Sequence, residues 1–190
     1  MSHLSPQPAN IRPHPLAREL AQRLAPGAAI LEIGAGARRN ANALAAAGFA
    51  MYAVPDDAVL GFTANDARFD AVLSTHGFLH GLLAQLEQLT AQTARSLRQG
   101  ALAHVTLAST ADARFGLGRA IASQTFVQES GDEAGVAHTF FDRRTARALF
   151  ETHFIIESLE ETHVDAVAGA WAHTQPSHGR VHWFVRAVRR

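Results

Sequence analysis

The hydrophobic positions of this chain fall into two patterns that alternate along most of its length. Short apolar runs of strand length are followed by stretches in which apolar residues recur at steps of three and four, as on one face of a helix. The pattern predicts strands at residues 29–33, 49–54, 69–75, 101–108, 154–159 and 181–188, and helices at residues 16–24, 40–47, 82–99 and 142–150. This alternation is typical of an α/β fold with a doubly wound, mostly parallel sheet.

Two segments lack either pattern. Residues 1–13 carry three prolines and predict a mobile tail, which leaves residues 14–190 as a single domain. Residues 109–139 contain several glycines among mixed polar residues and predict a long loop with short helical pieces above the sheet. Within this loop, residues 131–135 are interpreted as a lid beside His138 and Phe141, with plain surface variation as the alternative.

Composition excludes several classes of function. The 17 acidic residues balance 17 basic ones, all of them arginine, which argues against a nucleic-acid partner or a membrane surface bound through bulk charge. The absence of cysteine excludes disulfides and sulfur-based metal sites, and the absence of lysine excludes a P-loop. No apolar run is long enough to span a membrane, and no signal pattern opens the chain. A cytoplasmic protein is therefore expected, and its oligomeric state is not predicted.

A glycine turn between the first predicted strand and its helix is the strongest motif. Gly34 and Gly36 end the strand, and the helix that follows points its free N–H groups at whatever lies above the strand. A dinucleotide motif needs a third glycine where this chain has Arg39, so an NAD-linked enzyme is disfavoured. The carboxylate of Glu32, two residues before the first glycine, suits a ligand that carries an amino group. A turn without any ligand is the plain alternative.

These residues resemble the first motif of the class I S-adenosylmethionine (SAM) dependent methyltransferases, which reads acid-x-Gly-x-Gly-x-Gly. Glu32, Gly34 and Gly36 match it, whereas Arg38 replaces the last glycine and makes the motif degenerate. The run from Phe69 to Thr75 is similar to the fourth-strand motif of the same family. The resemblance implies a Rossmann-like sheet with an antiparallel last strand. Because Phe69 follows Pro55 by only fourteen residues, one crossover of that fold is deleted or reduced to a loop.

The resemblance also implies a cofactor site. The residues it assigns to SAM are Glu32, Gly34, Ala35, Gly36, Asn40, Asp56, Asp66, Ser74 and Thr75. Asp56 lies twenty residues past Gly36, a spacing that suits the ribose hydroxyls, although the Pro-Asp-Asp sequence also reads as a solvated turn. Asp66 is a candidate for the adenine amino group or for a turn cap.

The other half of the site follows the fourth-strand motif. His76 and His80 are the candidates for substrate contact or general-base catalysis, because histidine titrates near neutrality. The alternative is a helix-capping His76 and a surface His80. No metal site is predicted, because two histidines without a third ligand of known spacing are weak evidence. The residues assigned to substrate binding are His76, Phe78, His138 and Phe141.

The function these observations favour is SAM-dependent methyl transfer to an N, O or S nucleophile of a small molecule. The protein would contribute positioning and desolvation, so a general base is optional. The alternative is a catalytically inactive binding or regulatory protein on the same scaffold, because Arg38, Pro55 and the short segment before Phe69 all fall in the cofactor half.

Overall fold

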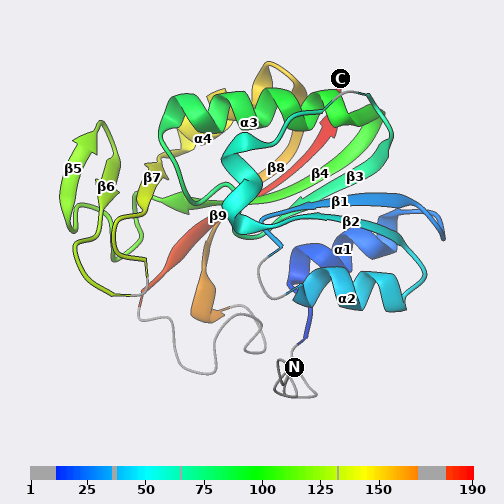
Figure 1. Ribbon diagram of the computed structural model, residues 1–190, viewed down its shortest axis with the longest axis horizontal. Helices are drawn as coiled ribbons and strands as arrows, with labels where there is room; N and C mark the ends of the chain where they lie inside the picture. Colours follow the sequence, from blue (N-terminus) through cyan, green and yellow to red (C-terminus); the bar gives the residue numbers. More distant parts are fainter. Residues whose placement is uncertain (1–11, 36–37, 65, 132, 167–178) are drawn as a thin grey trace, which may run out of the picture.

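The computed structural model describes residues 12–35, 38–64, 66–131, 133–166 and 179–190 (Figure 1). Most of the predicted tail at residues 1–13 therefore lies outside the described residues, as does Gly36. The strands are β1 (Ala29–Ile33), β2 (Ala50–Val54), β3 (Phe69–Ser74), β4 (Leu97–Ser109), β5 (Arg119–Ala122), β6 (Thr125–Val127), β7 (Ala137–Phe141), β8 (Phe154–His163) and β9 (Val181–Arg189). The helices are α1 (Pro15–Arg23), α2 (Arg39–Ala46), α3 (Leu83–Ser96) and α4 (Arg143–Glu151), with short 3-10 turns η1 (Asp56–Gly61) and η2 (Val164–Ala166).

The strands form one continuous sheet, which begins at one edge with the order β2-β1-β3-β4. These four strands run parallel to one another, whereas β9 pairs antiparallel with β4 and β8 pairs antiparallel with β9. The predicted fold class, a Rossmann-like and mostly parallel sheet with an antiparallel last strand, is confirmed. In such a sheet the carboxyl ends of the parallel strands share one edge, where ligands bind.

One crossover is missing, as the short spacing before Phe69 predicted. Between Val54 at the end of β2 and Phe69 at the start of β3, η1 is the only helical or strand element among the described residues. The chain passes directly from β2 to β3 on the other side of β1, so β2 is left at the edge of the sheet.

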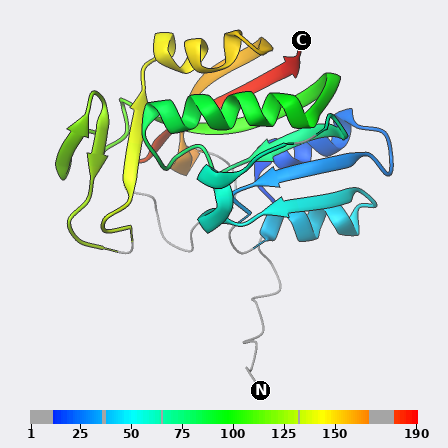
Figure 2. The same cartoon turned by 45° about the horizontal axis from the view of Figure 1, so that its top comes forward.

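The helices cover both faces of the sheet (Figures 1 and 2). α1 and α2 pack on one face, where Ile30 belongs to their apolar cluster. α3 and α4 pack on the other face, where Leu31 and Ile33 join a larger cluster. Side chains on both faces of β1 are thus buried in apolar clusters, which is why apolar residues occupy successive positions of the strand from Ala29 to Leu31. No helix in the described part of the chain is long and apolar enough to cross a membrane.

The prediction of a loop over residues 109–139 is wrong in part, because three strands lie there or begin there. β5 and β6 form a small hairpin, and β7 pairs with β6 on one side and with the end of β4 on the other. Every residue of β5 is exposed, and β6 has only three residues. Neither strand therefore shows the alternation of buried and exposed positions by which a strand is predicted. The helix predicted to run to Gly100 also ends earlier, at Ser96, and β4 begins at once with Leu97.

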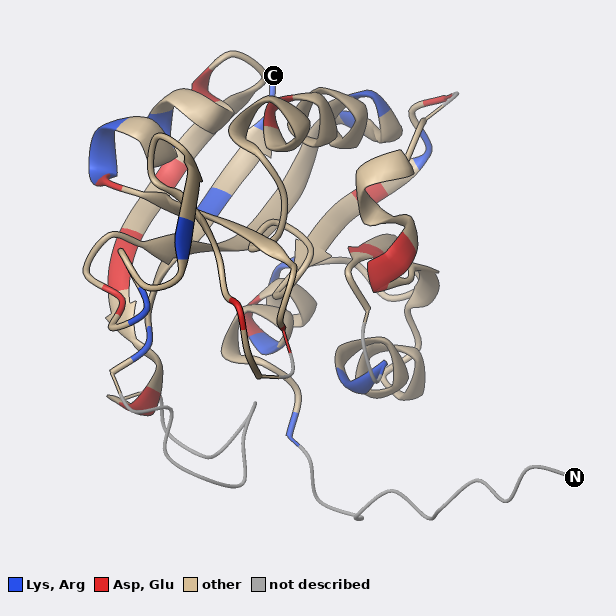
Figure 3. Ribbon diagram, turned by 60° about the vertical axis from the view of Figure 1, so that its left-hand side comes forward, with Lys and Arg blue, Asp and Glu red and all other residues tan. Residues whose placement is uncertain are grey.

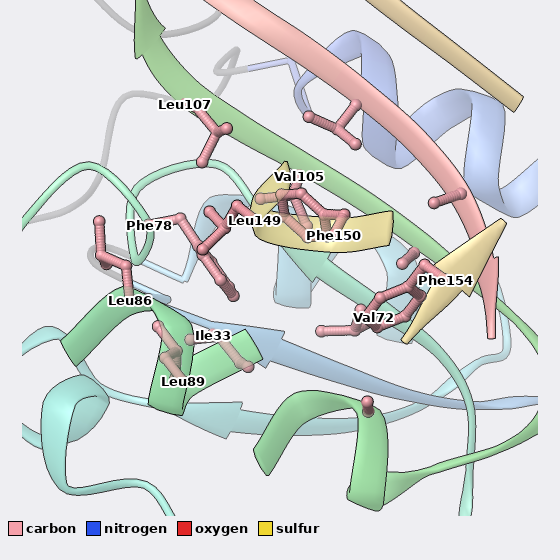
Figure 4. Close-up of a cluster of buried hydrophobic side chains, with 14 of the residues drawn as sticks. Ile33, Val72, Phe78, Leu86, Leu89, Val105, Leu107, Leu149, Phe150 and Phe154 are labelled. Carbon is pink, nitrogen blue, oxygen red and sulfur yellow. The ribbon is translucent and has the colours of Figure 1, made fainter. Parts of the chain in front are cut away.

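Phe78 and Phe141 were predicted to contact substrate, and the structure places both in the core instead. Each side chain is fully buried, in the cluster beneath α3 and α4 (Figure 4). Phe78 packs on Phe150 with ring centroids 5.8 Å apart. Their position beside the sheet edge therefore anchors the segments that carry the site, without exposing an aromatic wall to a ligand.

Replacing Phe78 by alanine tests this placement. The change leaves a cavity in a close-packed cluster, so we expect the free energy of unfolding to fall by about 3–5 kcal/mol. The matched truncation Phe115→Ala, at a side chain that is 38% exposed, should lower it by clearly less. Urea unfolding monitored by circular dichroism measures both. Equal losses in the two variants would contradict the core assignment of Phe78.

Candidate functional site

The carboxyl ends of β1 and β3 meet in direct backbone contact. Gly34 has a φ of +74°, and a Cβ added to it would lie 2.4 Å from the backbone nitrogen of Gly77. Ser74 fastens the contact, since its hydroxyl donates to the carbonyl of Ile33 at 2.8 Å and accepts from the N–H of Gly77 at 3.1 Å. Only glycine fits at position 34. The Ser74 hydroxyl, predicted to contact a cofactor, is used within the protein.

A buried polar network lies beside this contact, on the face of the sheet that α1 and α2 cover. The amide nitrogen of Asn40 donates to Glu32 Oε1 at 2.9 Å and to Thr75 Oγ1 at 3.2 Å. The amide oxygen of Asn40 accepts from the backbone N–H of His14 at 2.9 Å. Three residues predicted from the sequence, Glu32, Asn40 and Thr75, are thus brought together in one network.

Glu32 is the charged centre of this network. Only 1% of the residue is exposed, and this burial raises the pKa of its carboxyl, while hydrogen bonds from Asn40 and from the backbone of Ala41 lower the pKa and oppose the effect. Its second oxygen, Oε2, is buried and has no hydrogen-bond partner among the described residues. A buried carboxylate oxygen without a donor is costly, so the site is chemically suited to a cationic or N–H donor group.

The first two backbone N–H groups of the glycine turn are not free to bind a ligand. The N–H groups of Gly34 and Ala35 both donate to the carbonyl of Val54 at the end of β2, at 3.0 and 3.1 Å. Arg38, where the family motif has its last glycine, has a φ of 59° and precedes α2 without a side-chain cap. The backbone therefore adopts the left-handed conformation that a glycine would favour, with an exposed arginine in its place.

The two predicted carboxylates beyond β2 lie apart. Asp56, at the start of η1, reaches the glycine turn: its Oδ1 would lie 3.2 Å from a Cβ at Gly34. Asp66 instead lines a separate cavity of about 320 Å³ along the edge strand β2, beside Tyr52 and Arg68. The structure thus brings Asp56 to the candidate site and not Asp66.

Histidines form the other side of the site. His76 lies two residues past the end of β3. Its Nδ1 is 3.0 Å from the carbonyl oxygen of Thr75, and its ring centroid is 6.1 Å from that of His80. Burial and the neighbouring His80 lower the pKa of His76, so its imidazole is neutral near pH 7. His80 in turn pairs with His138 of β7 through an isolated antiparallel bridge. The predicted substrate contacts His76, His80 and His138 are therefore neighbours.

Two further histidines were missed by the sequence reasoning. His14 caps α1, and His182 is the second residue of β9. Burial, together with the nearby charge of Arg39, lowers the pKa of His14 to about 2. Burial lowers the pKa of His182 to about 3, although the carboxylate of Asp112 opposes the effect. No motif marks these residues. Both lie close enough to His76 to be affected by its charge, because α1 packs on β4 and β9 pairs with β4.

With this geometry in hand, comparison with solved structures shows the fold of SAM-dependent methyltransferases. One such enzyme from Methanosarcina mazei matches with a TM-score of 0.71 at 13% identity, over 94% of this chain and 98% of that one. The 1,6-didemethyltoxoflavin-N1-methyltransferase of Burkholderia thailandensis matches with a TM-score of 0.61 at 16% identity, over 93% and 77%. A SAM-dependent methyltransferase from Mesorhizobium loti matches with a TM-score of 0.56 at 15% identity, over 90% and 96%. No protein-family model matches the chain, and no curated protein does.

Because His182 is buried, we expect the free energy of unfolding to decrease at acidic pH. The unfolded chain binds a proton at this side chain below about pH 6.5, whereas the folded protein does so only below about pH 3. The unfolded state therefore holds more protons across this window, and the free energy of unfolding falls as the pH falls. Between about pH 6 and about pH 5 the free energy of unfolding should fall by roughly 1 kcal/mol less in His182→Gln than in the unaltered protein.

Urea unfolding at the two pH values measures this difference. His163→Gln, at an exposed position of β8, is the matched control and should leave the pH dependence unchanged. An identical pH dependence in His182→Gln and the unaltered protein would show that His182 is not held neutral by burial.

Proposed function

We propose that this protein is a SAM-dependent methyltransferase that acts on an N, O or S nucleophile of a small molecule. The observation that carries the proposal is the buried carboxylate of Glu32. Its free oxygen lies at the carboxyl edge of the parallel sheet, next to a turn in which only glycine fits. The α-amino group of the methionine portion of SAM is the kind of cationic donor that this oxygen lacks.

The residues present fit the cofactor in its amino-acid half. Glu32 would hold the amino group, Asn40 and Thr75 would keep the carboxylate in place, and Asp56 would accept from the ribose hydroxyls. SAM, when bound, would supply an electrophilic methyl group on its sulfonium. The protein's own contribution is then to position the two reactants and to exclude water, which its close-packed sheet edge favours.

On the acceptor side, His76 is the residue placed to receive a proton. Because burial keeps its imidazole neutral near pH 7, it can accept a proton from an O–H, N–H or S–H acceptor. A small molecule is the proposed substrate, without a nucleic-acid or membrane partner. The chain has 17 acidic and 17 basic residues, and both kinds are spread over several elements in Figure 3.

One observation favours a second candidate, an inactive binding protein on the same scaffold. The amides of Gly34 and Ala35 are already bonded to Val54, so neither N–H is available to a ligand. Arg38 further places a side chain where the family motif has none. Binding of SAM is therefore the property that separates the two candidates.

Glu32→Gln tests the proposal by isothermal titration calorimetry with SAM. A hydrogen bond between charged groups contributes about 1.5–3 kcal/mol, so the Kd for SAM should rise roughly 10- to 150-fold in the variant. Glu87→Gln, at an exposed position of α3, is the matched control and should bind as the unaltered protein does.

NAD serves as the second ligand of the same titration and should give no heat. The absence of heat with SAM would overturn the methyltransferase proposal and leave the binding protein. Equal SAM affinity in Glu32→Gln and Glu87→Gln would instead show that the cofactor binds without Glu32. Mass spectrometry of small-molecule mixtures incubated with SAM would then identify acceptors by a gain of one methyl group.

A further inference from the structure

The turn after β3, the segment before β7 and β7 itself each contribute one side chain to a group of three possible metal ligands. We infer that His80, Glu133 and His138 form a binding site for a divalent transition-metal ion of the zinc type. The three ligand atoms, two imidazole nitrogens and a carboxylate oxygen, all lie within 4.8 Å of one another. The sequence predicted no metal here, because the spacing of His76 and His80 supplied no third ligand.

The backbone fixes the two histidines opposite each other. His80 and His138 form an antiparallel bridge, in which directly opposed side chains project on the same face. The bridge is reinforced on either side: Gly81 N–H donates to the carbonyl of Ala137 at 2.8 Å, and the hydroxyl of Thr139 donates to the carbonyl of Gly81 at 2.7 Å. Their ring centroids are consequently 4.8 Å apart.

Glu133 completes the set from the other side. Its Oε2 lies 3.1 Å from His138 Nε2, and its Oε1 lies 3.5 Å from His80 Nε2. Two ligand atoms that share a zinc ion at about 2.1 Å stand roughly 3–4 Å from each other, so these separations suit a shared ion. The Nε2 of His80 is buried and has no hydrogen-bond partner within the described residues, which an ion would remedy.

The surrounding groups orient the ligands as they do in known metal sites. The other ring nitrogen of His138, Nδ1, is 3.1 Å from the carbonyl oxygen of Val136, which fixes the ring and leaves Nε2 for the ion. The guanidinium of Arg114 is 3.2 Å from Glu133 Oε2 and is itself held by the buried Asp112 at 3.1 Å. Two imidazoles and one carboxylate are a donor set that binds zinc and ferrous iron with at least one position open.

The three ligands lie close to His76, the proposed contact of the methyl acceptor. The site joins the turn after β3 to the strand β7, and the ring of His80 is 6.1 Å from that of His76. A bound ion would therefore fix the wall next to the proposed acceptor position and offer an open coordination position there. The inference does not depend on methyl transfer, because its test measures metal binding alone.

Zn²⁺ titration by calorimetry tests the site, on chelator-treated protein without any affinity tag. The unaltered protein should bind one equivalent, and Glu133→Gln should weaken binding by more than about 100-fold, beyond the loss usual for groups outside the ligand set. His138→Ala should do the same. The matched controls are Glu129→Gln and His163→Ala, both at exposed positions, which should bind as the unaltered protein does.

Co²⁺ in place of Zn²⁺ gives a second readout, since its visible absorption reports coordination by nitrogen and oxygen. The absorption should appear in the unaltered protein and be absent in Glu133→Gln, while the circular dichroism of the metal-free variant shows that it is folded. No binding by the unaltered protein, or equal binding by Glu133→Gln and Glu129→Gln, would overturn the site. The cluster would then be a polar network of Glu133, Arg114 and the two histidines, without an ion.

Discussion

The backbone contact between Gly34 and Gly77 is the constraint on which the rest of the site depends. Two parallel strands can approach this closely at their carboxyl ends only where neither residue has a Cβ, and Ser74 fastens the approach with two hydrogen bonds. The contact sets the position of Glu32 on one side and of His76 on the other. A carboxylate and the neutral imidazole of His76 thus flank a single edge of the sheet, the edge at which α/β proteins bind ligands.

Local patterns predicted most of the fold because each central element has a clear signature. The apolar run of β1, the leucines of α3 and the cap at Asp142 all appear in the structure close to where the sequence places them. The hairpin of β5 and β6 could not be predicted in this way, because both strands are short and every residue of β5 is exposed. Its formation depends on β7, which is fixed by pairing with the distant β4.

The site residues that belong to a sequence motif could be predicted, whereas those that only the folded chain brings together could not. Glu32 and Asn40 belong to a single strand-turn-helix unit, and Thr75 follows the next strand of the sheet, so a family resemblance located all three. His14 and His182 come from opposite ends of the chain and share no motif. Phe78 was predicted to contact substrate and is buried instead, because a position next to a motif does not reveal whether its side chain points into the core.

The central claim is that Glu32 receives the ammonium group of SAM, and proton release on binding tests it most directly. Burial raises the pKa of Glu32, so at any given pH more of this carboxyl is protonated than in an exposed glutamate, and an ammonium beside it should drive that proton off. Calorimetry of SAM binding in two buffers of different ionisation enthalpy, from about pH 5 to about pH 7, measures the protons released. The account predicts a release that grows as the pH falls through this range and is absent in Glu32→Gln. SAM binding with heats that do not depend on the buffer would contradict it.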